Sequence, residues 1–183
     1  FDYHGITPAH LWNDPEGIPL IEKSEARAVV ARHADLAMVH SEYMVEELTR
    51  HAQIDPHAIR VIPYVVPLDH FAPSAPDAEL IERYDLSGHF VLLYIGRMAG
   101  NKRIDDLVRG LAEVRKHYPN TKLLLVGNNT VPVYRKCAEA ALAIARDLGC
   151  EEQVIFTGPI PHSQLYRFYT TCHIYATASL HEG

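Results

Sequence analysis

Residues 90–108, FVLLYIGRMAGNKRIDDLV, decide the fold. The first six residues are a continuous apolar run, which is typical of a strand buried on both faces of a parallel sheet. A glycine ends the run, and Ile104, Leu107 and Val108 then return at helical spacing. Arg97, Lys102 and Arg103 lie between the two patterns, although the formal net charge of the chain is −6. The stretch therefore predicts a strand, a basic turn and a helix.

The same alternation extends outward in both directions. Further strands are expected at residues 36–39, 59–62, 122–126, 154–156 and 173–176. Helices are expected from Ser41 to about His51, from about 104 to 118, from Pro132 to Gly149, and over 163–171. Strands that alternate with helices imply parallel strands joined by right-handed crossovers. The predicted fold class is α/β, with Rossmann-like parallel sheets.

Residues 63–88 interrupt this rhythm, because they are rich in proline and lack periodicity. We read them as a linker between two α/β units. The first unit is too short to be complete. The chain also starts without a methionine or a signal segment and stops within a loop, so we expect an internal piece of a larger protein.

Composition excludes several classes of protein. Apolar residues make up 48% and charged residues 22% of the chain, which is ordinary for a globular protein. A pI near 6.0 disfavours a nucleic-acid partner. No apolar run is long enough for a transmembrane helix. Three cysteines without a CxxC pair favour a reduced, cytoplasmic setting. The twelve histidines form no HxxxH or HExxH motif, so no metal site is expected.

Small and polar residues follow each strand of the second unit. Gly96-Arg97, Gly127-Asn128-Asn129 and Thr157-Gly158 follow the first three strands, and the last is followed by residues 177–183, which include Glu182. Ligands of open α/β sheets bind at this edge, and an arginine there can donate to phosphate oxygens. The alternative is a solvated loop with ordinary surface charge. Arg103 is either a further ligand or solvent-exposed, and Glu46 and Glu47 are expected on a solvated helix face. The loop is neither a P-loop nor a GxGxxG fingerprint.

Five motifs, in order along the chain, resemble glycosyltransferase family 4, the group 1, GT-B type retaining enzymes. YIGRMAGNKRIDDLV resembles the donor-site signature, and SLHEG resembles the start of the glutamate–seven–glutamate motif. DYHGITP, VHSEYMVEEL and VIPYVVPLDHF resemble segments of the N-terminal domain and the hinge. The resemblance implies that 1–70 is the end of the acceptor-side domain plus linker. It implies that 71–183 is the first part of the nucleotide-sugar-binding domain, so that this piece lacks most of the N-terminal domain and the C-terminal end.

The resemblance also implies site residues. Arg97, Lys102 and the Gly96 backbone match groups that hold the donor diphosphate and stabilise it as leaving group. His4, Glu182 and Gly183 match groups at the donor sugar, so His4, Glu182, Arg97 and Lys102 are the expected catalytic residues. The donor is expected to be a UDP- or GDP-hexose. The acceptor is expected to be a hydroxyl of a glycan, a lipid-linked or a small molecule. No metal is strictly required.

Two departures and two alternatives accompany this reading. The family often has glycine after the lysine, where this chain has Arg103, and the second glutamate would fall at position 190, beyond the sequence. A sugar-nucleotide epimerase of the same architecture, or a non-catalytic nucleotide-binding module, would share the fold. We expect a cytoplasmic protein, either free or at the cytoplasmic face of the membrane, and no basic amphipathic helix here supports membrane association.

Overall fold

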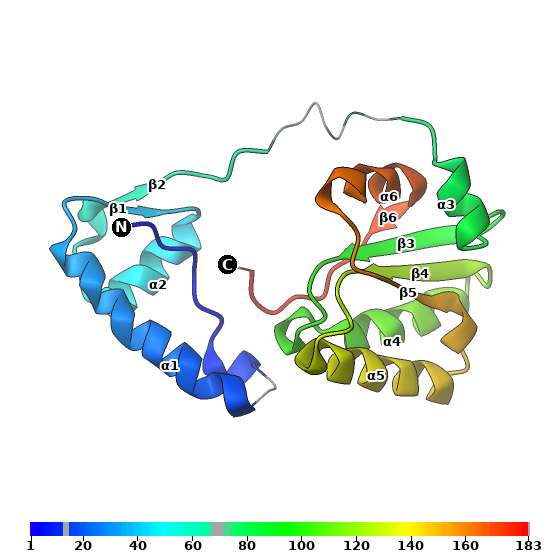
Figure 1. The fold of residues 1–183 in the computed structure, drawn as a ribbon, viewed down its shortest axis with the longest axis horizontal. Coiled ribbons are helices and arrows are strands. Elements are labelled where there is room, and N and C mark those ends of the chain that lie inside the picture. The colour runs from blue at the N-terminus through cyan, green and yellow to red at the C-terminus, as the bar shows by residue number, and fades with distance from the viewer. Residues whose placement is uncertain (13–14, 67–71, 73, 183) are drawn as a thin grey trace. The chain divides into compact units, whose positions relative to one another are not determined.

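The chain folds into two compact units in the computed structural model, which describes residues 1–12, 15–66, 72 and 74–182. Unit 1 consists of Phe1–Val66 together with His181–Gly183, and unit 2 of Pro67–Leu180 (Figure 1). The predicted domain boundary, between residues 70 and 71, lies outside the described residues. Each unit is α/β with parallel strand pairing, as the alternation of patterns predicts.

Unit 2 is built on a four-stranded parallel sheet with the order β5-β4-β3-β6. The strands are β3 (Phe90–Ile95), β4 (Thr121–Val126), β5 (Val154–Gly158) and β6 (Ile174–Tyr175). Leu92 of β3 pairs with Leu123 of β4 on one side and with Ile174 of β6 on the other. All six residues of β4 are buried, because neighbouring strands and helices cover it on every side. The sequence prediction of strand 90–95 is confirmed residue for residue.

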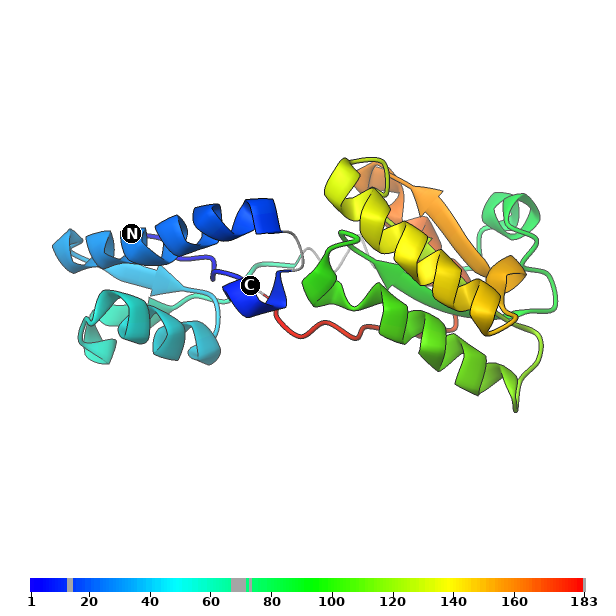
Figure 2. The same ribbon diagram turned by 90° about the horizontal axis from the view of Figure 1, so that it is seen from below.

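Helices cover both faces of this sheet. α4 (Ile104–Arg115) and α5 (Pro132–Asp147) lie side by side on one face, and α3 (Ala78–Arg83) and α6 (Leu165–Thr171) lie on the other (Figures 1 and 2). Successive side chains of a strand point to opposite faces, so Leu92 and Tyr94 pack toward α4 and α5. Val91 and Leu93 pack instead with Leu80, Leu86 and Phe168. Burial on both faces explains the unbroken apolar run.

Unit 1 has a smaller sheet of β1 (Ala37–Val39) and β2 (Ile59–Val61), with α1 (Ile18–Arg27) and α2 (Glu42–Ala52). Asp2 forms an additional parallel bridge with Met38. Ser41 begins α2 as predicted, since its hydroxyl accepts a hydrogen bond from the backbone N–H of Met44 at 3.3 Å. Buried apolar residues from the first segment, the residues after α1, both strands and α2 form one cluster. They include Tyr3, Ala28, Val39, Met44 and Leu48.

The structure corrects two predictions. Residues 63–88 are not linker throughout, because α3 lies within them and its Leu80 is buried in unit 2. Glu47 is not solvated, since only 3% of it is exposed, whereas Glu46 is exposed as predicted. No helix among the described residues has the length and apolar character needed to cross a membrane.

Candidate functional site

The carboxyl edge of the unit 2 sheet is made of closely packed backbone. The Gly96 N–H donates to the Val126 carbonyl at 2.9 Å, and the Gly127 N–H donates to the Gly158 carbonyl at 3.2 Å. A Cβ at Gly127 would lie 1.9 Å from the Gly96 carbonyl oxygen, so only glycine fits there. The glycines that follow β3 and β4 and the glycine that ends β5 are thus joined through their backbones. A ligand can approach the main chain at this place.

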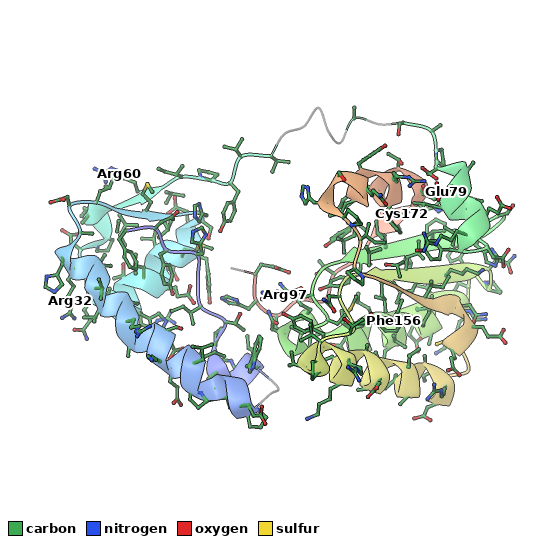
Figure 3. The ribbon with its side chains drawn as sticks, in the orientation of Figure 1. Arg32, Arg60, Glu79, Arg97, Phe156 and Cys172 are labelled. Atoms are coloured by element: carbon green, nitrogen blue, oxygen red, sulfur yellow. The ribbon has the colours of Figure 1, made fainter. Side chains whose placement is uncertain are left out.

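Arg97 lies at this edge with its side chain exposed (Figure 3). Its backbone is fixed, because the Tyr94 hydroxyl donates to the Arg97 carbonyl at 3.0 Å, and Tyr94 is buried in the core. A Cβ at Gly96 would meet the same hydroxyl at 2.5 Å, so glycine is also needed beside Arg97. The edge therefore presents a guanidinium from a rigid base, which suits recognition of an oxyanion.

The other two cations of the loop differ from Arg97. Lys102 ends the short 3₁₀ helix η6 (Gly100–Lys102) and is buried, with 8% of it exposed. Arg103 follows in the left-handed conformation, at φ 49° and ψ 53°. Its guanidinium lies 3.2 Å from Asp105 and 2.9 Å from Asp106, in the first turn of α4. The hydrogen bond that Arg103 donates to Asp105 is the main cause that raises the pKa of Arg103. The Arg103 guanidinium thus binds the first turn of its own helix.

The loop after β4 is organised by one side chain. The side-chain Oδ1 atom of Asn128 accepts from the backbone N–H groups of Thr130 at 2.9 Å and Val131 at 3.3 Å. These bonds turn the chain into α5, which begins at Pro132. The β6 side of the edge is tied to the basic loop, because the Leu180 N–H donates to the Asn101 carbonyl at 2.8 Å.

His4 lies in unit 1, beyond the segment that pairs with β1. Its side chain is 62% exposed, and its Nε2 atom lies 3.2 Å from Asp2 Oδ2. Its Nδ1 atom lies 3.0 Å from the Tyr64 hydroxyl. Both ring nitrogens therefore have oxygen neighbours, which fix the plane of the ring.

Glu182 is exposed, and Gly183 lies outside the described residues. The preceding His181 is buried, and its Nε2 atom lies 3.7 Å from Glu47 Oε1. Glu47 also faces Tyr3. Burial is the main cause that raises the pKa of Tyr3, and the charge of Glu47 adds to it. A buried carboxylate thus adjoins the residue directly before Glu182.

Sequence reasoning gave no site role to Asp2, His40 or Tyr64, and it expected Glu47 on a solvated helix face. Asp2 stood inside a quoted motif, but nothing in the sequence connects it with residues 40 and 64. A signal for Glu47 did exist, because Met44, Glu47 and Leu48 share one helix face at spacings of three and four residues.

The family model and the curated relatives point to the same protein family. The family model "Glycosyl transferases group 1" matches residues 78–183, more than half of the chain. A GDP-mannose-dependent alpha-(1-6)-phosphatidylinositol monomannoside mannosyltransferase of Mycolicibacterium smegmatis is 34% identical over 121 residues, 65% of this chain and 30% of that protein. A D-inositol 3-phosphate glycosyltransferase of Corynebacterium jeikeium is 27% identical over 165 residues, 84% of this chain and 38% of that protein. The chain thus spans less than half the length of these relatives.

Solved structures agree in fold. Sucrose-phosphate synthase of Thermosynechococcus elongatus has a TM-score of 0.73 and 22% identity, and the match covers 99% of this chain and 44% of that one. Anabaena Alr3699/HepE in complex with UDP and glucose has a TM-score of 0.77 and 19% identity, over 97% of this chain and 45% of that one. These likenesses show the expected α/β, GT-B type fold. With the family model and the curated relatives, they establish that the chain belongs to the group 1 glycosyltransferases.

Proposed function

We propose that the chain is part of a family 4 retaining glycosyltransferase. The enzyme transfers a hexosyl group from a nucleotide-diphosphate sugar to a hydroxyl acceptor. Unit 2 is the donor-binding side and unit 1 belongs to the acceptor side. The observation that carries the proposal is the exposed Arg97 guanidinium at the carboxyl edge of the sheet, beside glycines whose backbones are in contact.

The proposed chemistry is electrostatic. When the glycosidic bond to the donor breaks, negative charge develops on the leaving diphosphate, and cations already in place stabilise it without reorganising. Arg97 offers a planar fork of donors to this charge. Lys102, held in η6, adds a second positive charge to the same loop. Diphosphate stabilisation by these two side chains requires no metal ion.

The roles proposed for the other residues follow the family resemblance. His4 and Glu182 contact the donor sugar, and the Gly183 backbone belongs to the loop that holds its hydroxyls. His4 can reach a sugar hydroxyl if it exchanges its contact with Tyr64 or Asp2 for the ligand. The acceptor is a glycan, a lipid-linked or a small-molecule hydroxyl, and we place the reaction in the cytoplasm or at the cytoplasmic face of the membrane.

The donor proposal is a UDP- or GDP-hexose. It is supported by one relative whose name specifies GDP-mannose and by a neighbouring structure that holds UDP and glucose. These two proteins differ in the base of their nucleotide, so both UDP and GDP belong in the test.

Calorimetric titration of the 183-residue chain with UDP, GDP and ADP tests the proposal. One of them should bind. Arg97→Ala should weaken its binding about 10- to 150-fold, because one charge-assisted hydrogen-bonding group is worth about 1.5–3 kcal/mol. Lys102→Met, which keeps the buried stem, should also weaken it. The matched control is Arg109→Ala, which removes an exposed arginine of α4 and should leave affinity within about threefold.

Two results would contradict the proposal. A folded chain that binds none of the three nucleotides has no diphosphate site. Equal binding by the parent chain and Arg97→Ala would favour a non-catalytic module. Product analysis with donor alone addresses the remaining alternative, since an epimerase changes the sugar nucleotide without an acceptor.

A further inference from the structure

Unit 1 brings together Asp2, His4 and His40 at the end of its small parallel sheet. We propose that these three side chains form a binding site for a divalent transition metal of the Zn²⁺ class. No short sequence motif connects them, because His4 and His40 are 36 positions apart. This inference stands on the geometry of unit 1, and it shares His4 with the proposed glycosyl transfer, which places that side chain at the donor sugar.

The fold fixes the three ligands. The Tyr3 N–H donates to the Met38 carbonyl at 3.0 Å, and the Met38 N–H donates to the Phe1 carbonyl at 2.8 Å. These bonds hold the segment of Asp2 parallel to β1. His40 directly follows β1, and His4 follows the paired segment, so both histidines emerge at the same carboxyl edge.

The candidate ligand atoms lie close to one another. Asp2 Oδ1 lies 3.1 Å from His40 Nε2, and Asp2 Oδ2 lies 3.2 Å from His4 Nε2. One ligand atom from each residue can be chosen so that all lie within 4.8 Å of one another. Ligands about 2.0–2.1 Å from a tetrahedral zinc ion are separated by about 3.4 Å. Side-chain rearrangement would bring the three ligand atoms to a common ion.

The hydrogen-bond geometry of His40 supports the argument. Its Nδ1 atom lies 2.9 Å from the Ile62 carbonyl oxygen, and a carbonyl only accepts, so Nδ1 carries a proton. In the neutral ring, Nε2 then presents a lone pair toward the Asp2 carboxylate at 3.1 Å. Two acceptors that face each other repel. A cation placed between the two groups would remove this repulsion.

The orientation of His40 relative to Asp2 favours a shared metal ion over a direct hydrogen bond between the two side chains. His40 Nε2 is buried and makes no aligned hydrogen bond within the described part of the chain, despite its closeness to Asp2. Two ligands of one ion behave in this way, because each donor axis points to the shared ion and not to the neighbouring ligand. Metal-binding histidines also commonly donate their other nitrogen to a backbone carbonyl, as His40 does to Ile62.

The surroundings match an open metal site. The His40 side chain is 11% exposed, whereas Asp2 and His4 are 43% and 62% exposed, so solvent can supply a fourth ligand. Tyr64 supports both histidines. Its ring stacks on His40 with 4.0 Å between centroids, and its hydroxyl lies 3.0 Å from His4 Nδ1. Two imidazoles and one carboxylate select Zn²⁺, Co²⁺ or Ni²⁺ over Mg²⁺ or Ca²⁺.

The test is a titration of the chelator-treated, untagged 183-residue chain with Zn²⁺ by calorimetry, and with Co²⁺ by visible absorption. One ion per chain should bind, with a tetrahedral Co²⁺ spectrum. Affinity should fall toward acid pH, because histidine ligands must be neutral. His40→Gln should weaken binding by more than about 100-fold, and Tyr64→Phe, which keeps all three ligands, by about 10-fold.

Matched controls make the result decisive. His33→Ala removes an exposed histidine of unit 1 outside the cluster and should bind Zn²⁺ like the parent chain. Asp2→Asn keeps the shape of the side chain but removes its charge, and it should also weaken binding. This variant keeps the test decisive if His40→Gln disturbs the fold. Equal affinity of the parent, His40→Gln and Asp2→Asn would overturn the proposal. Absence of binding would also overturn it.

Discussion

Arg103 offers a sharp test of how the basic loop is built. It lies in the left-handed region and its guanidinium is paired with Asp105 and Asp106. Replacement by glycine and by alanine removes the same ion pairs. The difference in unfolding free energy between these two variants therefore isolates the backbone conformation.

The expected magnitude follows from two opposing terms. The left-handed conformation costs a residue with a Cβ about 1–2 kcal/mol. Glycine avoids this cost, but it loses about 0.4–1 kcal/mol of stability because it has more conformational freedom in the unfolded chain. Arg103→Gly should therefore be more stable than Arg103→Ala by about 1 kcal/mol. At Arg109, inside α4, the order should reverse, since glycine in a helix interior is about 0.8–1 kcal/mol less stable than alanine.

Urea denaturation followed by circular dichroism measures both differences. With slopes of about 1–3 kcal/mol per molar urea, the midpoints should differ by about 0.3–1 M, with opposite signs at the two positions. If Arg103→Ala is as stable as Arg103→Gly while the Arg109 pair behaves as expected, the left-handed conformation carries no cost and the reasoning is wrong.

Three further predictions concern the frame around the site. Gly127→Ala should destabilise unit 2 by more than about 2 kcal/mol, because its Cβ would lie 1.9 Å from the Gly96 carbonyl oxygen. The control Gly110→Ala has open space around it and should stabilise α4. Thermal unfolding compares the two variants. The hydrogen bond from Arg167 lowers the pKa of Asp77 from 3.8 to about 2, so its stabilisation is complete above pH 4 and is lost toward pH 2. Asp77→Asn should flatten the melting temperature across that window, and an unchanged slope would contradict this. Ser41→Ala should cost about 1 kcal/mol by loss of the α2 cap, whereas Ser41→Asp should retain most of it in the same denaturation assay.

The sequence predicted β3 and β4 of unit 2 well because they are buried on both faces. Their apolar runs are continuous, and glycine or proline marks their ends. Two helices were missed for physical reasons. α1 has no buried residue, so it shows no apolar stripe. α3 is short, has one buried residue and begins after a proline-rich stretch that hides it.

The candidate site was partly predictable. Glycines and polar groups that follow strands gather at one edge in any parallel sheet, which is why Gly96 and Arg97 could be placed from the sequence. The same pattern could not show that Arg103 pairs with its own helix, because that depends on a backbone conformation. The Asp2–His4–His40 cluster could not be predicted from the sequence either. Its residues come together only through strand pairing between segments that are far apart in the sequence.

The position of β3 in the sheet has a consequence during synthesis of the protein. β3 pairs with β4 after one crossover, but its other neighbour, β6, follows 82 residues later, at Ile174 opposite Leu92. Until the ribosome has released β6, one edge of β3 has open backbone donors and acceptors flanked by Leu92 and Leu93. Such an edge pairs readily with another chain. Nascent chains should therefore be most prone to associate in the interval between completion of β5 and emergence of β6.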